Sequence, residues 1–216
     1  MIEYPHVRRL VCVAGPPAVG KTNLLHTTKS GSAGLLQPLL GVGELSAIPA
    51  FAAGWVPKGF SGSDLAMYHY DFLRVWKFGG GSLNLASDSG AVPILKAEDL
   101  LVVTLVADPQ VLLQRYRARS VLKGTSVLSG LMRPRMLGGL LFGQYRTKWL
   151  YRRPKRLLGL YGEWIRFVES LQPSAHIFVD CTADLHEVSF HAWADSITSR
   201  YIERVVPVPG APTRST

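Results

Sequence analysis

The chain has 216 residues, of which 47% are hydrophobic and 18% charged, so it can form a core and is too apolar to be disordered. Its formal net charge of +9 is expected of proteins that handle phosphates, nucleic acids or anionic membranes, and does not choose between them. The two cysteines, Cys12 and Cys181, lie in apolar runs without a C-x-x-C pair or a Cys/His cluster. We therefore expect buried, reduced thiols and no thiolate metal site.

Membrane insertion and secretion are not predicted. The most apolar long stretch, residues 33–55, is interrupted by Gln37, Glu44 and two prolines, which argues against a spanning helix. The first residues lack the charged-then-apolar order of a signal peptide. We expect a cytoplasmic protein.

Predicted strands and helices alternate along the chain. Continuous apolar runs predict buried strands, and stripes of apolar residues predict amphipathic helices. The strands are expected at 7–15, 67–70, 99–109 and 175–182, and the helices at 20–30, near 90–97, from Pro109, at 156–171 and at 184–203.

This alternation predicts an α/β fold with three α/β/α layers and a mainly parallel sheet. Residues 1–206 are expected to form one domain. It would carry an insertion of loops and short helices at 31–64 and a basic, glycine-interrupted segment at about 120–156. Residues 207–216 read as a flexible tail.

Residues 15–22 read G-P-P-A-V-G-K-T and fit the phosphate-binding pattern G-x-x-x-x-G-K-[ST]. The glycines let backbone N–H groups turn toward phosphates, Lys21 would reach the β and γ phosphates, and the Thr22 hydroxyl would bind Mg²⁺. An apolar strand runs into the loop, as the motif requires. The predicted nucleotide-binding residues are Gly15, Pro16, Pro17, Ala18, Val19, Gly20, Lys21, Thr22 and Asn23.

With this loop the chain resembles the P-loop NTPase superfamily, and in particular its small kinases. No guanine-reading N-K-x-D motif and no acidic pair after a strand are present, which argues against switch GTPases and translocating ATPases. The resemblance implies ATP and Mg²⁺ as cofactors and phosphoryl transfer to a small acceptor. It covers the first strand, loop and helix well, and the rest only as an order of elements.

The stretch Y-H-Y-D-F-L-R, residues 68–74, ends the second predicted strand. Its Asp71 and Arg74 are similar to the D-x-x-R of adenylylsulfate-type kinases. That resemblance implies that Asp71 orients or deprotonates the acceptor hydroxyl and that Arg74 contacts an anionic substrate. The alternative is a strand-ending Asp71 that caps the next turn, with Arg74 as its surface partner.

The stretch T-L-V-A-D-P-Q-V-L-L-Q-R-Y-R-A-R-S, residues 104–120, resembles the segment before the lid of nucleotide kinases. Arg115 and Arg119 share one helix face and would reach the transferring phosphates, unless that face is simply solvated. Asp108 would order Mg²⁺ waters or cap the helix. The acid that organises the metal stays open among Asp71, Asp88 and Asp108.

The basic segment 120–156 reads as a lid in the kinase interpretation, closing on glycine hinges, with Arg133 and Arg135 as candidate substrate contacts. Its interleaved aromatic residues would also suit single-stranded nucleic acid, an anionic membrane surface or a plain basic face. The main expectation is an ATP-dependent kinase for a nucleoside, nucleotide, sugar or antibiotic-like acceptor. The alternative is a non-enzymatic nucleotide-binding protein that docks through this segment.

Overall fold

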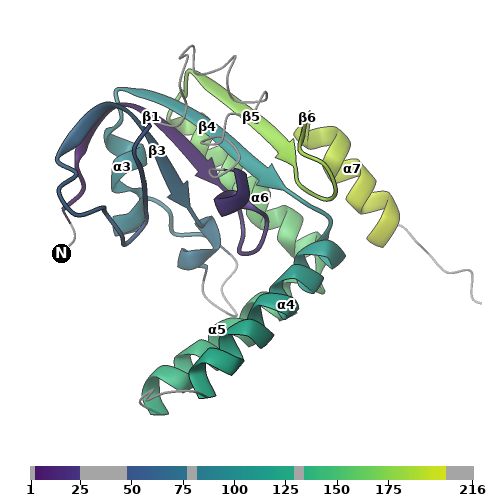
Figure 1. Ribbon diagram of the computed structural model, residues 1–216. Helices are drawn as coiled ribbons and strands as arrows, with labels where there is room; N and C mark the ends of the chain where they lie inside the picture. Colours follow the sequence, from purple (N-terminus) through teal and green to yellow (C-terminus); the bar gives the residue numbers. More distant parts are fainter. Residues whose placement is uncertain (1–2, 25–47, 77–81, 129–133, 203–216) are drawn as a thin grey trace, which may run out of the picture.

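The computed structural model describes residues 3–24, 48–76, 82–128 and 134–202, with side chains described outside 120–142. A six-stranded sheet has the order β2-β3-β1-β4-β5-β6 (Figure 1). The strands are β1 (His6–Ala14), β2 (Ala50–Ala52), β3 (Gly62–Tyr70), β4 (Asp99–Val106), β5 (Ala175–Asp180) and β6 (His186–Val188). The first five in spatial order pair in parallel, and β6 pairs antiparallel with β5, so the predicted α/β class with a mainly parallel sheet is confirmed.

The strand register brings the carboxyl ends of β1, β3 and β4 to the same end of the sheet, so the predicted site residues that follow these strands start there. Ala14 at the end of β1 pairs with Tyr70 of β3 on one side and with Thr104 of β4 on the other. The chain therefore leaves β1 toward β3 and returns on the opposite side as β4. In open α/β sheets, ligands bind outside the carboxyl ends of the strands where the direction of winding reverses in this way.

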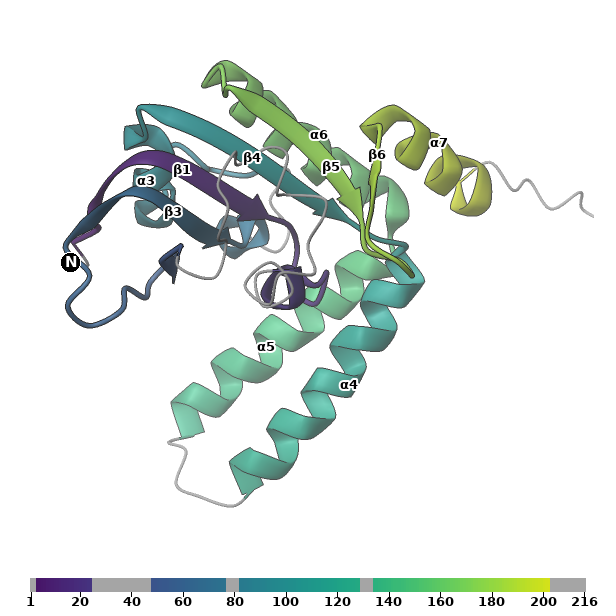
Figure 2. The ribbon, with the colours of Figure 1, turned by 45° about the horizontal axis from the view of Figure 1, so that its top comes forward.

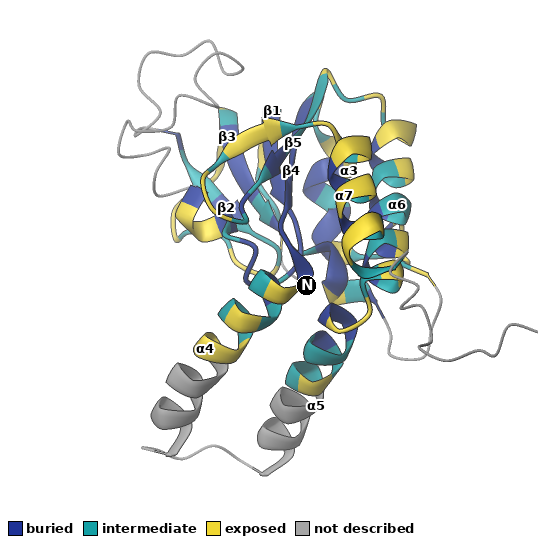
Figure 3. Cartoon of the chain, turned by 90° about the vertical axis from the view of Figure 1, so that its right-hand side faces the viewer, coloured by how far each residue is buried: buried dark blue, intermediate teal, exposed yellow. Residues whose placement is uncertain are grey.

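Helices α3 (Val92–Lys96), α6 (Pro154–Ser170) and α7 (Phe190–Tyr201) lie on one side of the sheet (Figure 3). Helix α6 carries the apolar stripe predicted for it, with Leu157, Tyr161, Trp164 and Val168 buried. Two of these side chains also bind β4, because the Tyr161 hydroxyl donates to the Leu105 carbonyl at 2.9 Å and Trp164 Nε1 donates to Thr104 Oγ1 at 2.9 Å. Within the described ranges, no helix combines the length and apolar character needed to cross a bilayer.

Helices α4 (Pro109–Leu128) and α5 (Pro134–Tyr151) run side by side and project from the sheet (Figures 1 and 2). The segment predicted as a glycine-interrupted lid is thus the second half of α4, α5 and the start of α6. The proposed hinge residues Gly138, Gly139 and Gly143 lie inside α5, and Gly130 lies outside the described residues.

Some predicted boundaries were wrong. The helix expected from 184 begins at Phe190, because residues 186–188 pair with β5 and Ser189 accepts a hydrogen bond from the Ala192 N–H as the cap of α7. Strand β3 begins at Gly62 rather than Met67. Gly62, Ser63 and Asp64 have low strand propensity, and pairing along the whole length of β1 overrides it.

Candidate functional site

The 15–22 loop leaves β1 at a position where no side chain fits. A Cβ on Gly15 would lie 2.8 Å from Val19 Cγ1 and 3.1 Å from the Leu105 carbonyl oxygen. Gly20 has φ of 118°, a conformation that side chains rarely adopt. Both glycines of the motif are therefore required by the backbone path itself.

A helical turn, Lys21–Leu24, follows the loop and places Thr22 and Asn23 on an exposed surface. The Leu24 N–H donates to the Gly20 carbonyl at 2.9 Å, which starts the turn. The rest of the helix predicted to residue 30 lies outside the described residues.

Lys21 is the buried cation of the site, with 5% of its surface exposed. Its Nζ donates to the carbonyls of Gly15 at 2.6 Å and Pro16 at 2.8 Å. Burial lowers the pKa of Lys21 to about 8, and the Asp71 carboxylate opposes that shift. A bound anion at this loop would relieve the cost of burying the ammonium.

Asp71 follows β3 directly and is half-buried. Its Oδ1 accepts a hydrogen bond from the Leu73 N–H at 3.0 Å and caps the 3-10 helix η2 (Phe72–Val75). Burial raises the pKa of Asp71, and the positive charge of Lys21 works against this rise. Among the described residues nothing donates to its Oδ2, so one oxygen serves the cap and the other can meet a ligand.

Arg74 pairs with Asp88 rather than with Asp71, its partner in the alternative interpretation. Its Nε lies 3.4 Å from Asp88 Oδ2, and the Tyr70 hydroxyl donates to the same oxygen at 2.8 Å. Asp88 therefore has two partners, Tyr70 and Arg74, and Arg74 is one half of an ion pair.

Of the two roles considered for Asp108, its contacts match the capping of helix α4. Its Oδ1 accepts from the Gln110 N–H at 2.8 Å, at the start of α4. Arg200 donates to Oδ2 at 2.7 Å, and the Tyr201 hydroxyl lies 2.8 Å from both oxygens. The carboxylate thus joins α4 to the end of α7, and its oxygens are already taken by these donors.

Arg115 and Arg119 both lie beside the 15–22 loop. Arg115 donates from Nη2 to the Thr182 carbonyl at 3.1 Å, and its Nη1 lies 3.5 Å from the Val19 carbonyl. The charge of Arg119 helps to lower the pKa of Lys21. Burial, and then the charges of Lys21 and Arg119, lower the pKa of His69 to about 4.

A cavity of about 490 Å³ opens between the loop, α4 and the segment after β5. Its volume lies in the range of small-molecule sites. Arg115 and Arg119 supply its charge. Its other lining residues are Ala18, Val19, Gly20, Asn23, Ala118, Cys181, Ala183 and Leu185.

The pair of helices α4 and α5, which we call the hairpin, contributes two contacts that the sequence analysis did not single out. The Tyr151 hydroxyl donates to the Pro17 carbonyl within the loop. Arg146 donates to the Trp76 carbonyl at 2.6 Å and to the Leu73 carbonyl at 3.4 Å, and its charge acts to lower the pKa of Asp71. The sequence of the basic segment did not distinguish these two side chains from their neighbours, because the direction in which each points depends on where α5 begins. The candidate Arg133 lies outside the described residues, as does the side chain of Arg135.

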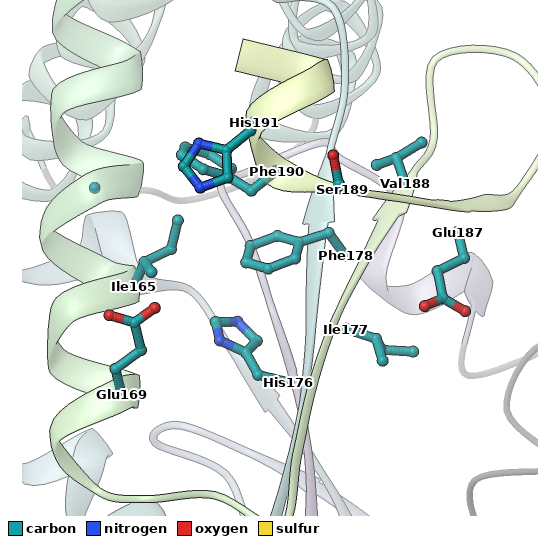
Figure 4. Close-up of a pocket in the computed structure, with 11 residues that line it drawn as sticks. Ile165, Glu169, His176, Ile177, Phe178, Glu187, Val188, Ser189, Phe190 and His191 are labelled. Atoms are coloured by element: carbon teal, nitrogen blue, oxygen red, sulfur yellow. The ribbon is translucent and has the colours of Figure 1, made fainter.

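A larger cavity, about 750 Å³, lies away from the loop between α6, β5, β6 and the start of α7 (Figure 4). Ile165 and Glu169 face it from α6, and His176 and Phe178 face it from β5. His176 Nε2 lies 2.9 Å from Thr104 Oγ1, and burial lowers its pKa to about 4. The lining contains no residue of the loop, so the smaller cavity is the candidate nucleotide site.

Comparison of the chain with protein-family models, with curated proteins and with solved structures found no match.

Proposed function

We propose that the chain is an ATP-dependent phosphotransferase that moves the γ-phosphoryl group to a hydroxyl or phosphate of a small-molecule acceptor. One observation carries this proposal. Lys21 lies in the helical turn after the loop that leaves β1, Asp71 directly follows the neighbouring strand β3, and each of the two groups changes the pKa of the other. A phosphate-binding cation beside a carboxylate with a free oxygen is the arrangement that phosphoryl transfer needs.

The residues present fit ATP with Mg²⁺. The loop backbone and Lys21 would hold the β and γ phosphates, and the cavity beside Arg115 and Arg119 would take the remainder of the nucleotide. The exposed Thr22 hydroxyl would be the protein ligand of Mg²⁺, with Asp71 able to bind a metal water. The metal neutralises charge on the phosphate oxygens when bound.

Asp71 Oδ2 would accept the proton of the acceptor hydroxyl as the acceptor oxygen bonds to the γ-phosphorus and the bond to the ADP oxygen breaks. The raised pKa of Asp71 makes it a better base than an ordinary aspartate. Lys21, Arg115 and Arg119 would then neutralise the charge that spreads over the phosphoryl oxygens.

The Asp71→Asn variant tests this role, because asparagine keeps the cap of η2 and removes only the charge. We expect turnover with a panel of hydroxyl and phosphate acceptors to fall at least about 100-fold. The affinity for MgATP should stay within about threefold, since Asp71 does not carry the loop contacts. Transfer of label from γ-labelled ATP measures the first quantity, and calorimetry measures the second.

Asp64→Asn is the matched control, because that side chain is 89% exposed at the start of β3. It should leave both quantities unchanged. Undiminished transfer in Asp71→Asn would exclude Asp71 as the base. Binding of MgATP by the unaltered chain with transfer to no acceptor would favour the alternative, a nucleotide-binding protein that docks through its basic segment.

A further inference from the structure

A second positively charged cavity lies where α5 turns into α6, a region that we call the elbow (residues 149–156). The cavity has a volume of about 720 Å³, within the range of small-molecule sites. Its charged lining residues are all cationic: Arg153, Lys155 and Arg156. Trp149, Tyr201 and Ile202 are among its remaining walls.

Aromatic rings hold the guanidinium groups in place. The Arg153 guanidinium lies 3.8 Å from the centre of the Trp149 ring, and that of Arg156 lies 5.6 Å away. Trp149 in turn stacks on the buried Trp76, with ring centres 6.0 Å apart, and the Arg146 guanidinium lies over the Trp76 ring. Cation–π contacts of this kind fix the direction of a guanidinium without neutralising it.

Within the described residues, Arg153 and Lys155 make no ion pair, although both are exposed. The Asp108 carboxylate, which Tyr201 contacts, is already paired with Arg200. Like charges gathered around one cavity repel each other, and an anion between them removes that repulsion.

We propose that the elbow is a binding site for a small, soluble, phosphorylated ligand, separate from the 15–22 loop. Phosphate oxygens suit arginine forks, which bind them through two parallel N–H donors. The guanidinium of Arg153, stacked on Trp149, and the exposed ammonium of Lys155 would bind one phosphate from two sides. The proposal does not depend on catalysis at the loop.

Inorganic tripolyphosphate is the probe, measured by calorimetry without Mg²⁺ in a Lys21→Met background, which removes the cation of the loop site. We expect one site to remain in Lys21→Met. Adding Arg153→Gln and Lys155→Gln should weaken binding at that site at least about tenfold, since each lost charged hydrogen bond contributes on this scale. Both substituted side chains are exposed, so the variant should fold, which its circular dichroism melt checks.

The charge-matched control adds Lys58→Gln and Lys96→Gln to Lys21→Met, because both lysines are exposed and lie outside the cavity. This control should bind as Lys21→Met does. Equal weakening in the two multiple variants would mean non-specific attraction to the net charge and would overturn the proposal.

Two further experiments distinguish a small soluble phosphorylated ligand from a membrane surface and from a nucleic acid. Capture by vesicles that contain a phosphoinositide, without binding of soluble tripolyphosphate, would assign the elbow to a membrane surface instead. Tighter binding of a single-stranded oligonucleotide than of tripolyphosphate, lost in Arg153→Gln/Lys155→Gln, would assign it to nucleic acid. Either result would overturn the proposal of a small soluble ligand.

Discussion

At the scale of single residues, Lys21 is the unusual feature of the molecule. A lysine that is 5% exposed normally carries a large desolvation cost. Here two carbonyls of its own loop and the Asp71 carboxylate offset part of that cost, but the pKa of Lys21 still falls to about 8. The folded chain therefore holds this charge at the expense of stability, as binding sites commonly do.

This cost predicts a pH dependence of stability. The unfolded chain keeps the Lys21 proton up to about its ordinary pKa of 10.5, while the folded chain releases it near pH 8. Between these values the unfolded state binds more protons, so the free energy of unfolding should rise with pH. The Lys21 contribution should reach on the order of 3 kcal/mol across this window.

Urea unfolding from pH 7.5 to 10.5, compared between the unaltered chain and Lys21→Met, measures the effect. The variant should be the more stable protein at pH 7.5, and the difference should shrink as pH rises. Parallel curves for the two proteins would show that Lys21 is not desolvated in the folded state.

At the scale of elements, the ends of β4 and α7 are joined through Asp108, which also caps α4. This one side chain positions the helix that carries Arg115 and Arg119. The hairpin is held a second time where α5 returns to the sheet, because Tyr151 donates to the 15–22 loop and Arg146 donates to the Leu73 carbonyl in η2. Both helices of the hairpin are thus anchored at the sheet, beside the candidate site.

Asp108→Ala should destabilise the chain by about 2–3 kcal/mol, because it removes a helix cap and leaves the Tyr201 hydroxyl without its acceptor. Chemical denaturation measures the loss. Arg200→Gln is the control: Arg200 is about half-exposed and should cost much less, since exposed ion pairs contribute little. Equal losses in both variants would mean that the ion pair, rather than the cap, is the main contribution of Asp108.

At the scale of the whole molecule, the sheet order creates the site. Winding from β1 to β3 on one side and back to β4 on the other places the 15–22 loop, Asp71 and the start of α4 after the carboxyl ends of three neighbouring strands. Because the site draws on three distant parts of the chain, a ligand bound there should stabilise the fold as a unit.

MgATP at about 100 times its Kd should add about 2.7 kcal/mol to the free energy of unfolding. For a chain of 216 residues this corresponds to a rise in Tm of roughly 5–10 °C. Scanning calorimetry of Arg153→Gln/Lys155→Gln measures the rise without a contribution from the elbow. The same variant with Lys21→Met added should show no rise, and an equal rise would place the nucleotide elsewhere.

The sequence alone determined the features that depend on neighbouring residues. The loop at 15–22, the strand that enters it and the start of α4 at Pro109 follow from consecutive side chains and backbone rules, and the alternation of elements was enough to predict the α/β class. The stretch at 184–189 was misread as helix, because its strand pairing to β5 depends on a partner elsewhere in the sheet.

Only the tertiary structure decided how the three candidate acids differ. Asp71, Asp88 and Asp108 look alike in sequence, but Asp88 is held by Tyr70 and Arg74, Asp108 is held by α4 and α7, and the charge of Asp71 acts on the pKa of Lys21. Strand order and helix facing set these contacts between residues that are far apart in the chain. For the same reason the basic segment could be recognised from its composition, whereas its hairpin, its contacts through Arg146 and Tyr151, and the charged cavity at the elbow required the fold.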